Sequence, residues 1–172
     1  DLPIKYSNGF HPAPRISFGD ALPLGVASEA ELVDLELTAP CDPATTAESL
    51  NHELPADVRV KNVALWPRKG PSPSNSLETA TYQVPLPAGL QVDLKQQVAE
   101  FLAATEAVVT RPKKKRSIEI DLRPWVADLW QEGSLLWMKL RSGSPLFLAA
   151  FLLDKDVEEV RALGISKTTV EV

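Results

Sequence analysis

The sequence predicts an α+β protein built from two ferredoxin-like (split βαβ) halves with mostly antiparallel sheets, the first half lacking its opening strand and helix. Three observations predict this class. Segments of alternating apolar and polar residues are interspersed with segments whose apolar residues recur at helical spacing. Fifteen prolines against eight glycines favour pinned loops and strand edges over a helical bundle. A Pro/Ser-rich linker at residues 67–76, "PRKGPSPSNS", separates residues 1–66 from residues 77–172.

The first half is predicted to contain short strands and one helix after an opening loop. Its elements are a loop, two strands, a helix and a strand, at 1–15, 16–18, 31–38, 43–54 and 58–66. Asp42 before Pro43 is typical of a helix start, because the carboxylate accepts from free backbone amides and proline needs no partner there. Pro55 ends this helix.

The second half is predicted to contain a strand, a helix, three strands, two short helices and a strand. These elements lie at 80–86, 94–105, 107–112, 117–122, 134–141, 146–153, 156–164 and 165–172. Asp93 provides the N-cap of the first helix, and Gly164 is the C-terminal glycine of the last one.

The single cysteine, Cys41, limits the chemistry. It excludes an internal disulfide and favours a reducing, cytoplasmic location. An iron–sulfur cluster needs about three or four thiolates, and a zinc site would have only His11 and His52 as imidazole ligands, so we expect no cofactor or metal in this chain. No run approaches the roughly 20 apolar residues of a membrane span, and no signal peptide is visible. The net charge of −5 argues against sequence-blind nucleic-acid binding over the whole surface.

The stretch "YSNGFHPAPR", residues 6–15, is the strongest candidate site. Gly9 permits a backbone that side chains resist, and Pro12 and Pro14 keep their neighbours extended. A stiff segment displays its side chains at low entropic cost. Aromatic rings stack on unpaired bases, and arginine adds phosphate and stacking contacts. The predicted substrate-binding residues are Tyr6, Ser7, Asn8, Gly9, Phe10, His11 and Arg15.

Two other uses of the same residues stay open. In a packing role, Phe10 fills a core, the prolines shape a turn, and Arg15 pairs with an acid such as Asp20. In a catalytic role, His11 acts as acid or base and Arg15 stabilises an anion. No carboxylate lies close to His11 in the sequence to orient it.

The run from Tyr6 to Leu37 resembles the radical-SAM-linked proteins, also known as domain of unknown function 2344. The family's run reads Tyr-Ser-x-Gly-Phe-(His/Asn)-Pro-x-Pro, then Arg or Lys, Ser-Phe, Leu-Pro-x-Gly-Val and Ser-x-x-Glu. The matching positions here are Tyr6, Ser7, Gly9, Phe10, His11, Pro12, Pro14, Arg15, Ser17, Phe18, Leu22, Pro23, Gly25, Val26, Ser28 and Glu31. The likeness continues more loosely through "LNHELP", "ATYQV", "IDLRPWV" and the final strand.

The resemblance implies a domain found alone or fused behind a radical SAM enzyme, with the iron–sulfur cluster and S-adenosylmethionine held by that partner. The family's usual gene surroundings hint at an RNA substrate, a tRNA or an rRNA. Members normally carry an upstream strand and helix before the "LPI" stretch. This chain begins at Asp1, and its only methionine is Met138, so we expect a piece of a longer protein with an incomplete first sheet.

A basic run, "RPKKKR", is the second candidate site, with five positive charges in six residues. Such a local potential suits a phosphate backbone, and binding there would weaken steeply with salt. A solvated hairpin loop, or lysines that protect a strand edge, is the alternative. The predicted nucleic-acid backbone residues are Arg111, Lys113, Lys114, Lys115, Arg116 and Arg123.

Three of the four tryptophans, Trp125, Trp130 and Trp137, lie close together in the sequence. Packing in a core or an interface is the more usual role of tryptophan, and a stacking platform is the alternative. Trp66, before the linker, is a candidate to join the two halves.

Three functions are therefore weighed. The first is a non-catalytic accessory domain that binds RNA for a radical SAM enzyme. The second is an RNA-processing or RNA-modifying enzyme that uses His11. The third is a structural or dimerisation domain. The sequence does not determine the substrate or the oligomeric state.

Overall fold

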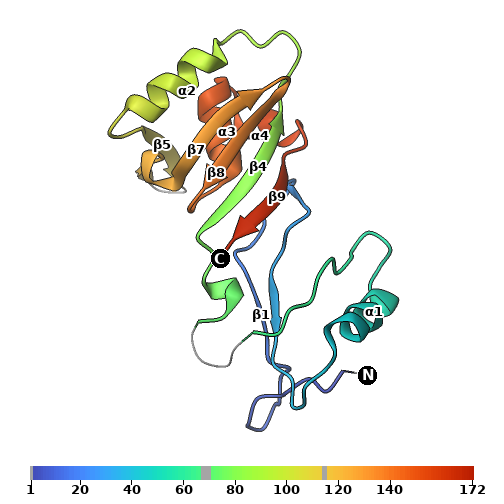
Figure 1. Cartoon of the computed structure of the whole chain (residues 1–172). Helices are drawn as coiled ribbons and strands as arrows, with labels where there is room; N and C mark the ends of the chain where they lie inside the picture. Colours follow the sequence, from blue (N-terminus) through green and yellow to red (C-terminus); the bar gives the residue numbers. More distant parts are fainter. Residues whose placement is uncertain (1, 67–70, 114–115) are drawn as a thin grey trace. The chain divides into compact units, whose positions relative to one another are not determined.

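A computed structural model describes residues 2–66, 71–113 and 116–172 (Figure 1). In those residues the protein is a mixed α+β structure with four α-helices and mostly antiparallel sheets, which confirms the predicted class. The chain divides into two compact units: unit 1 is 1–20 with 32–76, and unit 2 is 21–31 with 77–172. Residues 21–31 thus pack with the second unit although they precede the linker. The ferredoxin-like character of both halves stays a prediction.

Unit 2 contains a five-stranded sheet in the order β2-β9-β4-β8-β7 and a separate β5–β6 hairpin. Its elements are β2 (Ala27–Ser28), β4 (Thr79–Pro85), α2 (Leu94–Ala103), β5 (Val108–Lys113), β6 (Arg116–Asp121), the 3₁₀ turn η2 (Arg123–Trp125), β7 (Val126–Glu132), β8 (Leu135–Leu140), α3 (Pro145–Leu153), α4 (Val157–Arg161) and β9 (Ser166–Glu171). β2 is parallel to β9, and the other pairs are antiparallel. Without β2 and the hairpin, the chain order is strand, helix, strand, strand, helix, strand, the order of a βαββαβ unit.

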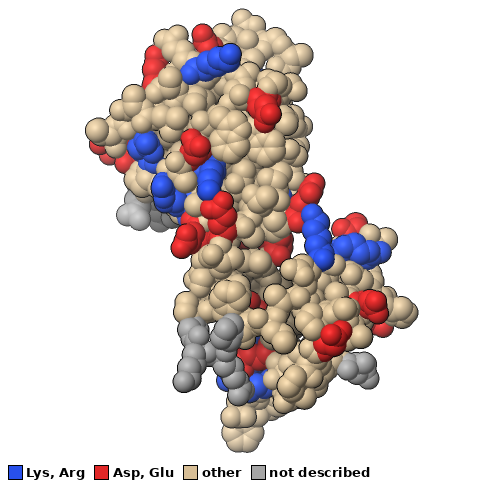
Figure 2. Space-filling view, viewed as in Figure 1, with Lys and Arg blue, Asp and Glu red and all other residues tan. Residues whose placement is uncertain are grey.

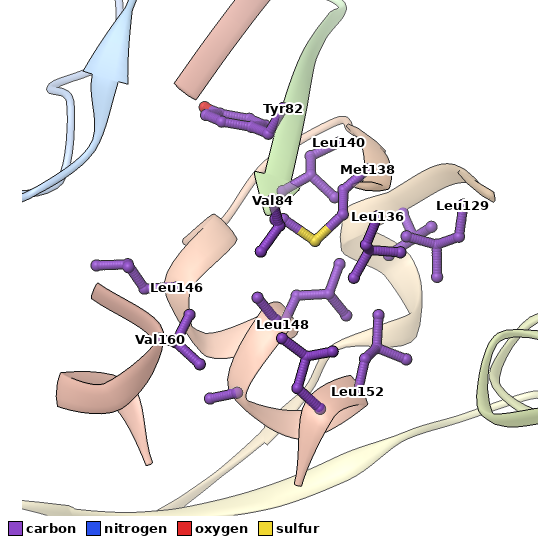
Figure 3. Close-up of a cluster of buried hydrophobic side chains, with 14 of the residues drawn as sticks. Tyr82, Val84, Leu129, Leu136, Met138, Leu140, Leu146, Leu148, Leu152 and Val160 are labelled. Atoms are coloured by element: carbon purple, nitrogen blue, oxygen red, sulfur yellow. The ribbon is translucent and has the colours of Figure 1, made fainter. Parts of the chain in front are cut away.

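Buried and more exposed side chains alternate along β4 and β8, so one face of the unit 2 sheet lines the core. Val84, Leu136 and Met138 are fully buried on that face, and they point toward α3, whose Leu148 and Leu152 are fully buried as well (Figure 3). α3 also contacts α2 and α4. A helix enclosed in this way has to be apolar on all sides, as "PLFLAAFLL" is.

Residues 21–31 join unit 2 through β2 and through an ion pair between Glu31 and a buried lysine. The backbone amide of Ala27 donates to the carbonyl of Ile165 at 2.9 Å. The side chain of Lys167 is only 5% exposed, and its Nζ lies 2.5 Å from a carboxylate oxygen of Glu31. Removing Glu31 would leave the buried ammonium of Lys167 without its counter-ion. The Ser-x-x-Glu end of the family's run therefore has a structural role.

Strand β7 was not predicted from the sequence. Its alternation is broken by an irregularity between Val126 and Asp128, so the apolar residues do not recur every second position. Gly133, with φ of +57°, begins the two-residue turn to β8. Gly133 and Ser134 stand between two runs rich in β-forming residues. Such a Gly-Ser pair is a hairpin signal that could have identified β7 from the sequence.

Unit 1 has little core of its own in the residues that the structure describes. Its elements are β1 (Ile16–Phe18), β3 (Val33–Leu35), α1 (Pro43–Glu53) and the 3₁₀ turn η1 (Pro73–Asn75). α1 begins as predicted, with the carboxylate of Asp42 accepting from the Thr45 amide at 2.9 Å. Only Thr46 and Ser74 are buried in the described part of this unit.

The strand predicted over residues 58–66 is wrong. Val60 donates its backbone amide to Oδ1 of Asn51 at 2.8 Å, and its carbonyl accepts from Nδ2 of the same side chain at 3.0 Å. The backbone is thus paired to an asparagine of α1 and not to a neighbouring strand, and Val58 and Leu65 remain exposed.

Asp34 on β3 binds η1, the 3₁₀ turn near the end of unit 1, through its carboxylate. Its carboxylate accepts from the Ser74 amide at 3.2 Å, from the Ser74 hydroxyl, and from the Ser17 hydroxyl at 3.4 Å. Burial alone would raise the pKa of Asp34, but the hydrogen bonds from Ser74, Ser72 and Ser17 lower it by more, so the pKa lies below its ordinary value of 3.8.

We expect Asp34→Asn to destabilise unit 1 by about 1–3 kcal/mol at pH 7, because Ser74 is buried and loses a charged acceptor. The native carboxylate's contribution is complete above pH 3.8, the ordinary pKa, and is lost as the pH falls through the lowered folded value. Urea unfolding followed at the Trp66 indole resonance measures this. The two proteins should become equally stable in acid, and a gap that persists unchanged to pH 2 would contradict the assignment.

In the residues that the structure describes, the helices are too short or too polar to cross a lipid bilayer.

Candidate functional site

Three extended segments of unit 1 position the candidate site. The Lys5 amide donates to the Glu36 carbonyl at 2.8 Å, the Arg15 amide to the Lys5 carbonyl at 2.8 Å, and the Glu36 amide to the Arg15 carbonyl at 3.1 Å. An isolated antiparallel bridge between Ile4 and Leu37 extends this pairing beyond β1 and β3. The segment that carries the motif is therefore held on both sides at its base.

The motif itself forms a closed loop whose tip projects from this base. The Ser7 amide donates to the Ala13 carbonyl at 2.8 Å, and the Ala13 amide donates back to the Ser7 hydroxyl at 3.0 Å. Ser7 is therefore half-buried and holds the loop closed. Gly9 has φ of +134°, a backbone that only glycine adopts readily.

The aromatic side chains of this loop are displayed and not packed. Phe10 is 103% exposed, as much as in an isolated peptide, and Tyr6 is 55% exposed. Asn8 and His11, beside Phe10 at the tip, are exposed as well. A core-filling role for Phe10 is excluded in this structure, and the ring is available to a partner.

Arg15 is anchored by an acid, which is Glu36 and not Asp20. Its Nη1 lies 3.1 Å from Glu36 Oε1, and Lys5 Nζ lies 2.9 Å from Oε2 of the same carboxylate. Hydrogen bonds from Lys5 and then Arg15 hold the pKa of Glu36 below its ordinary value. The three side chains together carry one net positive charge, and each is about a third to a half exposed.

His11 has no orienting group in the part of the chain that the structure describes. The interactions resolved there give its imidazole no hydrogen-bond or ion-pair partner. A general base is normally oriented by a second group. Within the same described residues, no cluster of three or more His, Cys, Asp or Glu is arranged to hold a metal ion.

The basic run lies in unit 2, on the β5–β6 hairpin. Lys113 pairs with Arg116 across the hairpin. Lys114 and Lys115 lie outside the described residues, as do the side chains of Arg111, Lys113 and Arg116.

Arg123 is engaged inside unit 2. Its guanidinium donates to the Leu102 carbonyl at 3.3 Å and to the Val126 carbonyl at 3.4 Å. It also lies 5.9 Å from the centre of the Phe101 ring, within cation–π range. These contacts give Arg123 a packing role independent of any nucleic acid.

The tryptophans do not form one cluster. Trp130 and Trp137 stack on each other across β7 and β8, whereas Trp125 is partly buried against the core of unit 2. Trp66 belongs to unit 1, where its indole donates to the Pro71 carbonyl at 3.1 Å.

Sequence reasoning missed Lys5 and Glu36. The pair lies 31 residues apart, so no local pattern connects them. An acidic residue on the polar side of the strand predicted at 31–38 was the available signal, since a displayed arginine on a neighbouring strand needs such a partner.

Comparison with known protein families matches residues 1–159 to the family described as "Uncharacterized protein conserved in bacteria (DUF2344)". No curated protein matches the chain.

Proposed function

This chain belongs to DUF2344, a family of uncharacterised bacterial proteins, and on that premise we propose that it is a non-catalytic accessory domain that binds RNA. The RNA is a tRNA or an rRNA, and the domain positions it for a radical SAM modifying enzyme in the cytoplasm. The observation that supports this proposal most is Phe10, fully exposed at the tip of a closed loop.

The chemistry of the loop and its base fits an unpaired nucleotide. The exposed Phe10 at the tip offers a face for base stacking, and the Arg15 guanidinium at the base offers charge to a phosphate. Arg15 and Lys5 share a single carboxylate, so one positive charge is left over for the ligand. The lysines and arginines of the run 111–116 would add backbone contacts.

The thiol count supports this division of labour between the domain and its partner enzyme. One cysteine cannot provide the three or four thiolates of an iron–sulfur cluster. In this proposal the cluster, S-adenosylmethionine and the radical belong to the partner enzyme, and this domain provides affinity and orientation.

We expect Arg15→Ala and Glu36→Gln to change RNA affinity in opposite directions. Arg15→Ala removes one cation, so it should weaken binding and reduce the slope of log K against log salt by about 0.7–0.9. Glu36→Gln releases Arg15 and Lys5 from their shared carboxylate, so it should tighten binding. Fluorescence anisotropy with labelled bulk tRNA and rRNA fragments, from about 50 to 200 mM salt, measures both.

Arg59→Ala is the matched control. Arg59 is an exposed arginine of the same unit, and its guanidinium contacts only the carbonyls of Pro55 and Val58 in the described residues. Equal losses for Arg15→Ala and Arg59→Ala would indicate diffuse charge attraction and contradict the site. RNA turnover by the isolated chain that disappears in His11→Ala would replace the proposal with the enzyme alternative.

A further inference from the structure

One face of the unit 2 sheet carries two stacked tryptophans. Trp130 on β7 and Trp137 on β8 are register partners, with ring centroids 5.8 Å apart and planes 1° from parallel. Trp137 Nε1 is buried without a hydrogen-bond partner in the described residues. Trp130 is 36% exposed, and Trp137 covers only one side of its ring.

This face is the one that the helices leave uncovered. Leu129, Leu136 and Met138 alternate with the tryptophans and are buried on the opposite, helical side. In Figure 1, α3 and α4 lie behind the strands β7, β8 and β4. Figure 2 has the same view and shows mostly uncharged atoms over these strands, with separate acidic and basic side chains among them. One side of the Trp130 ring is therefore free of the stacking contact with Trp137, on the sheet face that the helices leave open.

Two carboxylates flank the exposed ring. Asp128 and Glu132 lie two positions before and two after Trp130 on β7, so all three side chains point to the same face. The Asp128 carboxylate accepts from the backbone amide of Leu129 at 2.8 Å. In the described residues neither carboxylate has a cationic partner.

The two described cations on this face, one on β8 and one directly after it, have partners of their own. Lys139 is the register partner of Asp128, but its Nζ lies 2.7 Å from a carboxylate oxygen of Glu171. Arg141, which follows β8 at its other end, donates to the Val126 carbonyl at 2.5 Å. The end of the sheet beside the β7–β8 turn therefore presents an aromatic ring between two negative charges.

We propose that this surface binds an extended segment of a partner protein that carries an arginine or a lysine, with the cation seated on Trp130 between Asp128 and Glu132. Tryptophan is the best cation–π acceptor, and a planar guanidinium can stack on an indole while it donates to a carboxylate. RNA fits less well, because its phosphates would lie beside the same two carboxylates. This inference does not depend on RNA binding by residues 6–15.

The test uses the whole chain and two short peptides, acetyl-Ala-Arg-Ala-Arg-Ala-amide and its citrulline counterpart. Citrulline keeps the planar shape of arginine and removes the charge. The indole NMR resonances of the four tryptophans are followed. The arginine peptide should move the signals of Trp130 and Trp137 and leave Trp66 and Trp125 unchanged, and the citrulline peptide should move none of them at the same concentration.

Variants then assign the contacts. Trp130→Ala should weaken binding of the arginine peptide roughly three- to thirty-fold. Asp128→Asn and Glu132→Gln should each weaken its binding roughly two- to five-fold. Glu119→Gln, an exposed acid on β6, should have no effect. The two acid variants alter exposed side chains and keep the test valid if Trp130→Ala does not fold.

Three results would overturn the proposal. One is the absence of any shift with the arginine peptide. Another is an equal response to the citrulline peptide, which would indicate planar stacking without charge recognition. The third is a larger shift of the Trp130 signal with an oligouridylate, which would assign this face to RNA.

Discussion

Phe10→Ala is expected to weaken RNA binding by roughly five- to 150-fold, the loss of about one stacked base. The unfolding temperature should stay unchanged, because a ring that is 103% exposed has no packing to lose. The backbone of the loop is held by Ser7 and Ala13, so the substitution leaves the loop closed. Anisotropy with labelled tRNA and thermal unfolding of the same samples measure both quantities.

Phe18→Ala is the matched control for this experiment. Phe18 lies on β1 of the same unit and is 68% exposed, but it lies outside the loop closed by Ser7 and Ala13. It should bind RNA nearly as well as the native chain. Equal losses for the two variants would show that exposed aromatic area, and not the displayed tip, determines affinity. A lower unfolding temperature for Phe10→Ala would assign the residue to packing.

Gly143→Ala is expected to destabilise unit 2 by about 2–5 kcal/mol. Gly143 has φ of +81°, a conformation that costs a side-chain-bearing residue about 1–2 kcal/mol. A Cβ there would overlap the six-membered ring of Trp125, which is rigid and packed against the core, and such overpacking adds about 1–3 kcal/mol. Urea unfolding followed by circular dichroism measures the loss.

Gly164→Ala separates the two causes. Gly164 has φ of +80°, and no atom lies within 4 Å of a Cβ built on it, so only the backbone cost of about 1–2 kcal/mol should appear. In a Trp125→Ala background, Gly143→Ala should cost no more than Gly164→Ala. Equal destabilisation by Gly143→Ala and Gly164→Ala in the native background would contradict the contact with the indole.

Locally determined features of the fold could be predicted from the sequence. The starts of α1 and α2 follow from Asp42 and Asp93, whose side chains accept from backbone amides three residues later. The stiff, extended course of the segment around Phe10 could be predicted for the same reason, since glycine and proline act on their immediate neighbours, but the choice between a displayed and a packed ring stayed open.

Features that depend on distant residues could not be predicted. The prediction of a strand at 58–66 was wrong because the backbone of Val60 pairs with the side chain of Asn51, which lies on the preceding helix. Residues 21–31 belong to unit 2 because β2 pairs with β9 at the other end of the chain. The partner of Arg15 is likewise 21 residues away, and nothing in a local pattern selects Glu36 over Asp20.

Crosslinking in cells tests the central claim most directly. The full-length protein would be crosslinked to RNA by ultraviolet light, and both the bound RNA and the modified peptide would be sequenced. The display of residues 6–15 predicts nucleotide adducts on that segment, at Tyr6, Phe10 or His11, with one RNA class enriched and with both signals reduced in Phe10→Ala. Adducts confined to other segments, or an unchanged yield in Phe10→Ala, would contradict it.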